Sequence, residues 1–439
     1  MAYTVMSNQD NPEVKNNFMG SFDKKDVSRL RELAKQVMDL ATLDLMKERK
    51  DGWKHLHDLK PDRPMILFET FSVSGFVTEE ELQCSNDILR NIERSMVYNI
   101  KQYHELNDDL VIEPYFRLPW KMLKGDYGVT IEEHHAQDSL AYLSNFPIKT
   151  PDDLNKLKER DFSVDRDYTY DVKQKIEGIF GDILPVALGN YDNFFSELGF
   201  TPFTGNMFIG LTMDLFKLIG NENMMFWAYD HPDAIHRLMR FLCDDRVRFF
   251  KWMQSENLLV PNTDNQFGGP SSYGYVSELL SPDSSNKVVL KDLWVWPESQ
   301  ESVTFSPQMF KDFFLGYLAE VSNLFGLSYY GCCEPLDDRI DLIQKAIPNL
   351  RTVSISGWND FRKIGSLLGK NYVHAKKPNP AFISGASPDW ERMAKDIKDS
   401  FDACPNGNME VVVRDVYDIN GDMKRLGQWV EMTKNIVGR

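Results

Sequence analysis

The chain has 439 residues, of which 50 are Lys or Arg and 66 are Asp or Glu, so its formal net charge at pH 7 is −16. Because binding to nucleic-acid phosphates requires a basic face, this charge argues against a nucleic-acid partner. No run approaches the about 18 consecutive apolar residues of a membrane span, and residues 1–17 lack the pattern of a targeting segment, so we expect neither a membrane location nor export.

The first predicted element is an amphipathic helix over residues 24–50. Its apolar residues recur at the spacing of one buried helix face. We expect this helix to belong to an N-terminal helical extension, residues 1–60, that precedes one large domain over residues 61–439.

Short apolar runs alternate with longer helical stretches through that domain. The predicted strands are Met65–Glu69, Leu110–Glu113, Leu184–Leu188, Val288–Trp296, Leu327–Cys333, Arg351–Ile355, Tyr372–Ala375 and Met409–Val413. The predicted C-terminal helices are Ser306–Phe325, Leu336–Ala346, Asn359–Leu368, Asp389–Ala403 and Met423–Ile436. Such alternation is typical of parallel strands joined by helical crossovers. The polar, Gly/Ser-rich stretch Gln266–Asn286 is expected to be a lid or binding loop.

This alternation is compatible with a closed (β/α)₈ barrel and with an open, doubly wound sheet. A dinucleotide-binding open sheet would carry Gly-x-Gly-x-x-Gly after its first strand, and the sequence contains neither this motif nor a P-loop. The α/β fold that we predict is therefore a (β/α)₈ TIM barrel with the N-terminal helical extension. In such barrels the functional groups lie at the carboxyl ends of the strands.

Polar and aromatic residues follow the predicted strands. Those at strand ends are Asp264, Asn265, Glu298–Glu301, Cys332–Glu334, Trp358, Lys377–Asn379 and Asp415. Glu298, Glu301 and Asp264 are candidates for an acid with a raised pKa, and Lys377 is a candidate holder for an anion. Nearby aromatic residues are candidates for a slot that takes a flat ring, or for ordinary packing: Tyr191, Phe194, Phe195, Trp294, Trp296 and Trp358.

Two adjacent cysteines, Cys332 and Cys333, are followed directly by Glu334. Neighbouring cysteines do not form an unstrained disulfide with each other, so we expect free thiols. Thiolates and a carboxylate can bind a soft divalent metal, for which zinc is the natural candidate; the alternative is a pair of small buried apolar side chains. The chain has five cysteines, without the spacing of a disulfide framework, which favours a reducing, cytoplasmic location.

Four stretches, in this order, resemble the uroporphyrinogen decarboxylase superfamily. They are Tyr229–Asp233, Asn262–Asn265, Phe305–Phe310 leading to Gly331–Cys333, and Leu367–Val373 with Lys377–Ala381. Members of this superfamily are (β/α)₈ barrels that include tetrapyrrole decarboxylases and corrinoid-dependent methyltransferases. Within it, Trp296–Glu301 together with Gly331–Pro335 is most similar to the methyltransferases of anaerobic O-demethylase systems.

The chain also departs from these relatives. The decarboxylases hold substrate carboxylates with an arginine-rich N-terminal segment, but Phe68–Phe76 contains no arginine, so a tetrapyrrole is a poor substrate. The methyltransferases carry a His-x-Cys zinc half-site and a later cysteine. Here the histidine is replaced, and Arg414 and Asp415 lie where the later cysteine would fall. Any metal would therefore use Cys332 or Cys333 with carboxylates such as Glu334 or Glu298.

The resemblance implies a methyltransferase that moves a methyl group from a small O-methylated substrate to the Co(I) corrinoid of a carrier protein. We expect this substrate to be a methoxylated aromatic compound. The oxygen that leaves the methyl group would be activated by zinc on Cys332, Cys333 and Glu334, or by an acid. The implied substrate-binding residues are Tyr191, Trp296, Trp358, Lys377 and Asn379. Two alternatives stay open: a decarboxylase or lyase of a small aromatic or pyrrolic acid that uses Asp264, and a non-catalytic binding module. The implied partners are the carrier protein and the methyl donor, and a homodimer is left open.

Overall fold

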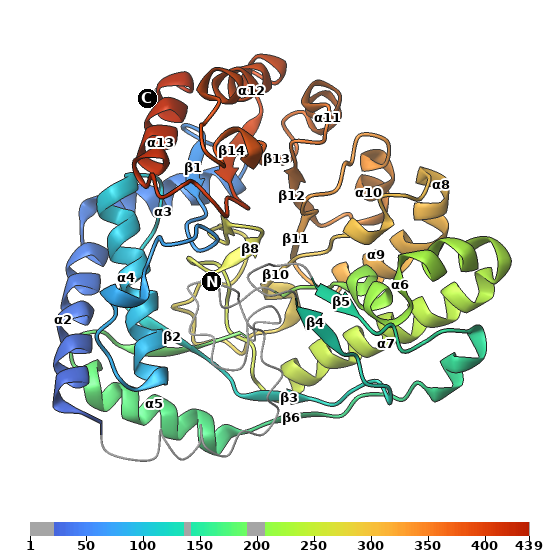
Figure 1. Ribbon diagram of the computed structural model, residues 1–439, viewed down its shortest axis with the longest axis horizontal. Coiled ribbons are helices and arrows are strands. Elements are labelled where there is room, and N and C mark those ends of the chain that lie inside the picture. The colour runs from blue at the N-terminus through green and yellow to red at the C-terminus, as the bar shows by residue number, and fades with distance from the viewer. Residues whose placement is uncertain (1–21, 136–141, 191–206, 439) are drawn as a thin grey trace.

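The computed structural model describes residues 22–135, 142–190 and 207–438. Its centre is a six-stranded parallel sheet in the order β1-β14-β13-β12-β11-β10. These strands are β1 (Met65–Phe68), β10 (Trp294–Val295), β11 (Leu327–Tyr330), β12 (Leu350–Ile355), β13 (Val373–Lys376) and β14 (Asn408–Val413). The sheet curls, and helices surround it on the outside (Figure 1). The protein is thus of the α/β class, as the alternating pattern predicts.

The helices that cover the sheet begin with residues suited to capping. Asn86 accepts the backbone N–H groups of Ile88 and Leu89 at the start of α4, and Ser306 accepts that of Met309 at the start of α8. After α2 and α3, described below, the helices are α4 (Asp87–Leu106), α5 (Arg166–Phe180), α6 (Leu211–Asp230), α7 (Pro232–Ser255), α8 (Pro307–Phe310), α9 (Gly316–Ser322), α10 (Ile340–Ala346), α11 (Phe361–Leu368), α12 (Trp390–Ala403) and α13 (Lys424–Ile436). A π-helical turn, Lys311–Leu315, joins α8 to α9.

The described residues also form four two-stranded sheets and an isolated parallel bridge between Phe208 and Trp296. The sheets are parallel β2 (Phe116–Pro119) with β7 (Val186–Gly189), and antiparallel β3 (Met122–Lys124) with β6 (Phe162–Val164), β4 (Glu133–His135) with β5 (Tyr142–Ser144), and β8 (Phe267–Gly269) with β9 (Ser272–Tyr273). The continuous ladder within the described residues is therefore a curled half-barrel. The closed eight-stranded barrel predicted from the sequence is seen there only in part.

Side chains extend the curl beyond the ladder. The Asp109 carboxylate accepts the backbone N–H of Ile66 at 2.8 Å, which ties the segment after α4 to β1. The Asn190 side chain bonds both the N–H and the carbonyl of Val260, at 2.9 and 2.8 Å. The Asn262 side chain does the same to Trp294 in β10, at 2.9 and 3.1 Å. These amide and carboxylate bridges occupy backbone groups that a ladder would otherwise pair.

The predicted N-terminal helix is two helices, α2 (Lys24–Ala41) and α3 (Asp44–His57). The break follows Thr42, whose hydroxyl bonds the carbonyls of Met38 and Asp39 and so competes with continuation of the helix. Both helices share one apolar core with α4 and α5. No helix of the described residues is long and apolar enough to cross a membrane.

The segment Gln266–Asn286, predicted as a lid or binding loop, includes an internal hairpin. Residues 266–276, which include β8 and β9, are all buried, and Figure 1 shows β8 at the centre of the ring of helices. Gly269 allows this approach, because a Cβ there would lie 2.1 Å from the Tyr329 ring. The Trp294 indole donates to the Gly274 carbonyl at 2.8 Å. We call residues 266–276 the central hairpin.

Two other predicted strands are displaced. Leu110–Glu113 forms no strand, and β2, which follows it in the chain, makes the pairing instead. Val288–Trp296 shortens to β10, because residues Leu290–Asp292 form a 3₁₀ turn. Residues 110–113 and 293–296 are buried, but tertiary contacts determine which residues of each run pair.

Candidate functional site

Polar residues gather at the carboxyl ends of the central parallel strands. They are Glu69 after β1, Glu298 after β10, Cys332–Glu334 after β11, Lys377 after β13, and Arg414 with Asp415 after β14. We call this group the strand-end cluster. Parallel strands bring their carboxyl ends to one edge of the sheet, which is where α/β enzymes build their sites.

The two cysteines are presented by a turn at Gly331, whose φ of 97° favours glycine. The Trp296 indole donates to the Gly331 carbonyl at 2.9 Å and so holds this turn. The Sγ atoms of Cys332 and Cys333 lie 3.6 Å apart. Arg414 Nη1 is 3.7 Å from Cys332 Sγ, and Asp415 Oδ2 is 3.7 Å from Cys333 Sγ.

Glu334 supports the same turn from inside. Its carboxylate accepts the backbone N–H groups of Ser299 and Cys332, at 3.1 and 2.9 Å. Burial raises the pKa of Glu334, and these two N–H groups oppose the rise. The side chain therefore joins the segments that follow β10 and β11.

Glu298 and Glu301 are placed beside Glu334. Burial, and then the nearby Glu301 and Glu334 carboxyl groups, raise the pKa of Glu298 well above its ordinary value. Glu298 Oε2 accepts the Gln300 N–H at 2.8 Å, but Oε1 is buried without a hydrogen-bond partner among the described residues. Burial also raises the pKa of Glu301, whose Oε2 accepts the Thr212 hydroxyl at 2.7 Å. This arrangement favours a protonated Glu298.

The expected zinc ligands do not form a metal cradle as they lie. Among the described residues, no group of three or more His, Cys, Asp or Glu side chains is placed to hold a metal ion. The Arg414 guanidinium, a cation, faces Cys332, while both Glu334 oxygens are taken by backbone N–H groups. Zinc on Cys332, Cys333 and Glu334 therefore stays a prediction that this arrangement does not support.

Lys377 links the sheet to the central hairpin. Its Nζ donates to the Pro270 carbonyl at 2.8 Å and lies 3.9 Å from Glu410 Oε1. Burial lowers the pKa of Lys377 to about 8, although Glu410 opposes this. The Ser272 hydroxyl donates to Glu410 Oε2 at 2.7 Å. Lys377, predicted to hold a substrate anion, is thus engaged with the chain itself.

Glu69 connects the hairpin tip to the cysteines. The Ser271 hydroxyl donates to Glu69 Oε2, and Arg414 Nε lies 3.5 Å from the same oxygen. Ser271 has a φ of 55°, so the tip is held in a conformation that side chains rarely adopt. Burial raises the pKa of Glu69, and Arg414 opposes the rise. The sequence did not predict Ser271, Ser272 and Glu410 as site residues. The signal that could have indicated Glu410 is its position as a glutamate inside the apolar run Asn408–Val413.

Asp264 belongs to a separate set of contacts. Its Oδ2 accepts the Tyr115 hydroxyl at 2.7 Å and an Arg117 N–H, while Oδ1 accepts the backbone and side-chain N–H groups of Gln266 at 2.9 and 3.0 Å. Arg117 and Tyr115 were also not predicted. Asp264 is therefore a fully engaged partner of Arg117.

The predicted substrate-binding residues are dispersed. Trp296 is buried against the Phe208 ring, with centroids 4.7 Å apart. Trp358 is 71% exposed, and Asn379 accepts the Ala381 N–H at 3.0 Å to begin a short 3₁₀ helix. Tyr191, with Phe194 and Phe195, lies outside the described residues. Among the described members of the predicted slot, Trp294 and Trp296 thus share one apolar cluster, whereas Trp358 lies exposed.

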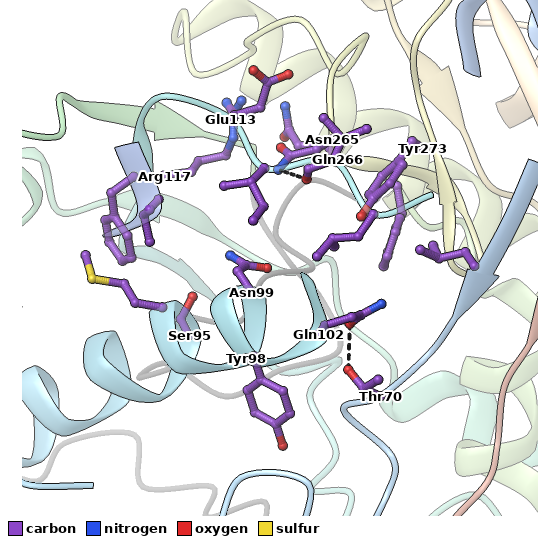
Figure 2. A pocket seen from close by; sticks show the side chains of 18 of the residues that line it. Thr70, Ser95, Tyr98, Asn99, Gln102, Glu113, Arg117, Asn265, Gln266 and Tyr273 are labelled. Atoms are coloured by element: carbon purple, nitrogen blue, oxygen red, sulfur yellow. Dashed lines mark hydrogen bonds between the residues drawn. The ribbon is translucent and has the colours of Figure 1, made fainter. Parts of the chain in front are cut away.

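A cavity of about 80 Å³ lies between the end of β1, helix α4 and residues 110–117 (Figure 2). Its polar lining includes Glu69, Thr70, Ser95, Asn99, Gln102, Arg117, Asn265 and Gln266. Apolar residues such as Leu67 and Phe116 complete the wall. Because Glu69 belongs to both the lining and the strand-end cluster, the cavity adjoins that cluster.

No protein-family model and no curated protein sequence matches the chain. Among solved structures, it is similar to a methyltransferase from Methanosarcina mazei, with 10% sequence identity and a TM-score of 0.46. The similarity covers 88% of this chain and 98% of that one. At this level of similarity, function has to be argued from the site itself.

Proposed function

We propose that this protein is a methyltransferase, which takes a methyl group from a small O-methylated compound and passes it to the Co(I) corrinoid of a separate carrier protein. The order of segments that resembles the uroporphyrinogen decarboxylase superfamily supports this proposal. The observation that carries it is Glu298, a buried carboxyl group with a raised pKa and one oxygen without a partner among the described residues.

The chemistry needs a proton at the leaving oxygen. An ether oxygen is a poor leaving group unless it is protonated as the C–O bond breaks. The corrinoid supplies the nucleophile for the methyl carbon. Glu298 holds a proton and gives it to the oxygen, so that the electron pair of the broken bond leaves with a neutral alcohol or phenol. Glu301 and Glu334 help by raising the pKa of Glu298 further, which favours its protonated form.

A complete (β/α)₈ barrel is part of the same proposal. The bridges made by Asp109, Asn190 and Asn262 support it, since they link strand segments beyond the six-stranded ladder. The decarboxylase or lyase alternative has less support. It would use Asp264, whose two oxygens are already occupied by Tyr115, Arg117 and Gln266.

The direct test is methyl transfer to free reduced cobalamin, with a panel of aromatic and aliphatic methyl ethers as donors. We expect Glu298→Gln, which cannot supply the proton, to lower turnover by roughly 10²–10⁴-fold. The control is Glu320→Gln, because Glu320 lies exposed on α9, where it pairs with Arg240. Near-normal turnover in the Glu298 variant would contradict the role that we assign to this residue.

The zinc version of the mechanism makes its own prediction. If zinc on Cys333 activated the oxygen, Cys333→Ala would lose bound metal and lower turnover by roughly a hundredfold or more. Cys404→Ala is the matched control, since this thiol lies near the Gly365 carbonyl on α11. Normal turnover by a Cys333 variant, in protein that metal analysis finds free of zinc, would leave protonation by Glu298 as the aid to the leaving oxygen.

A further inference from the structure

The cavity beside α4 is built from polar groups that point inward. Figure 2 shows Ser95 and Asn99, one helical turn apart on α4, directed into the space below Arg117. Gln102, on the same helix, bonds Thr70 Oγ1 at 2.7 Å. A cavity with this lining, next to the strand-end cluster, is suited to a polar ligand.

Two of its lining residues carry buried acceptors that lack a partner among the described residues: Gln266 Oε1 and Glu69 Oε1. Gln266 is 1% exposed and Glu69 is 4% exposed. The orientation of the Gln266 amide is determined, because its Nε2 donates to the Pro261 carbonyl and to Asp264 Oδ1. Its oxygen is therefore a true acceptor, and buried acceptors left without a donor are costly.

The charges around the cavity are paired. Arg414 lies beside Glu69, Arg117 beside Asp264, and Lys50 beside Glu113. Each of these carboxylates thus faces a cation, although Arg414 is shared with Asp415 at 3.3 Å, so the wall offers no unpaired cation to an anionic ligand. A neutral molecule that brings hydrogen-bond donors satisfies the unpartnered acceptors without the cost of burying a charge.

We propose that this cavity binds a small, neutral, aliphatic molecule through a hydroxyl group that donates to Gln266 Oε1. The volume of about 80 Å³ holds roughly five atoms the size of a water oxygen, whereas a cavity of about 150 Å³ is known to hold benzene. A hydroxylated aliphatic compound therefore suits the space better than an aromatic ring. Glu298 is not among the residues that line this cavity, so the site is separate from the acid that the proposed function uses.

Calorimetric titration of the full chain tests the site with four probes of similar size. 2-Methoxyethanol is neutral with a hydroxyl donor, 1,2-dimethoxyethane is neutral without one, methoxyacetate is an anion and 2-methoxyethylamine is a cation. We expect saturable binding of 2-methoxyethanol and affinities at least about tenfold lower for the other three. Tightest binding of the anion, the cation or the diether would overturn the proposal.

A pair of substitutions at Ser95 locates the binding. Ser95→Leu should fill the cavity and abolish binding of 2-methoxyethanol, while Ser95→Ala, which leaves the space open, should keep its affinity within about threefold. Circular dichroism melting establishes that both variants are folded. If Ser95→Leu does not fold, the four-probe comparison on the native chain still decides. Unchanged binding in a folded Ser95→Leu variant would overturn the location.

This site can be tested apart from the proposed function. Binding of 2-methoxyethanol would support the site whether or not methyl transfer to reduced cobalamin occurs. No binding of 2-methoxyethanol would overturn the site, whatever the transfer assay shows with aromatic ethers.

Discussion

At the scale of single residues, the chain is marked by buried carboxyl groups with raised pKa values. Glu69, Glu298 and Glu410 each keep one oxygen without a hydrogen-bond partner among the described residues. Burial raises the pKa of all three. A group whose pKa is raised in the folded state favours folding at low pH, and this contribution is lost as pH rises through the folded pKa. Such residues therefore cost stability at high pH.

Glu298→Gln should make the protein more stable at high pH while it lowers methyl transfer. The amide cannot ionise, so the variant escapes the cost of burying a carboxylate that the native chain carries above the raised pKa. We expect the difference in free energy of unfolding, variant minus native, to grow from pH 5 to pH 9 in urea titrations. A difference that shrinks with rising pH would contradict the raised pKa.

His57 should make stability fall in acid. Burial lowers its pKa to about 4 from an ordinary value of 6.5, and its Nδ1 lies 3.0 Å from the Tyr275 carbonyl. Neutral His57 contributes fully to the free energy of unfolding at pH values above the pKa that this side chain has in the unfolded chain. The contribution is lost as the pH falls below that value. Between pH 7.5 and 5.5 this loss is about 1 kcal/mol. Urea unfolding of His57→Gln at both pH values should show a smaller loss than the native chain; an equal loss would exclude His57 as its source.

At the scale of elements, the central hairpin is the feature that most affects the site. Its tip contacts Lys377 through Pro270 and Glu69 through Ser271, so it positions residues from β1 and β13 at once. The hairpin also forms part of the cavity beside α4, since Gln266, Ser271 and Tyr273 line it. Its composition is polar and rich in Gly and Ser, which in a sequence is typical of a surface loop.

Gly269→Ala should destabilise the protein, because the new Cβ would lie 2.1 Å from the Tyr329 ring. We expect a loss of about 1–3 kcal/mol in the free energy of unfolding. Gly178→Ala in α5 is the matched control, since nothing lies within 4 Å of its Cβ and alanine favours a helix. Equal stabilities of the two variants in urea titrations would contradict the close packing of the hairpin.

At the scale of the whole molecule, the N-terminal helices are part of the central structure. Trp53 of α3 is fully buried, and its indole donates to the Asp109 carbonyl at 2.9 Å. Its ring also meets Tyr273 of the hairpin edge-on, with centroids 5.2 Å apart. Arg29 of α2 bonds Glu93 of α4 at 2.8 Å. The extension thus contacts the hairpin, β1 and α4.

Trp53→Ala should therefore destabilise the entire protein. Loss of a fully buried tryptophan costs about 3–5 kcal/mol. Urea unfolding followed by hydrogen exchange should show the loss in the central strands as well as in α2 and α3. The exposed Trp358→Ala variant is the control and should change stability little. Loosening confined to residues 24–57 would show that the extension folds independently.

Local pattern was sufficient for several features. The apolar runs predict β1, β11, β12, β13 and β14 to within a few residues, because a buried parallel strand must be apolar on both faces. The carboxyl ends of these strands then predict that Glu298, Cys332 and Lys377 lie at one edge.

Other features depend on residues far apart in the chain. Arg414 meets Cys332 across 82 positions, and Ser271 meets Glu69 across 202, so neither contact has a local signal. The burial of the central hairpin depends on Gly269 meeting Tyr329, and the pKa of Glu298 depends on burial and on Glu334 from the next strand. Sequence by itself determined where most strands and helices of the C-terminal half lie, since periodicity is a local property. Tertiary structure decided which charges lose water and which find partners, because desolvation depends on what packs around a group.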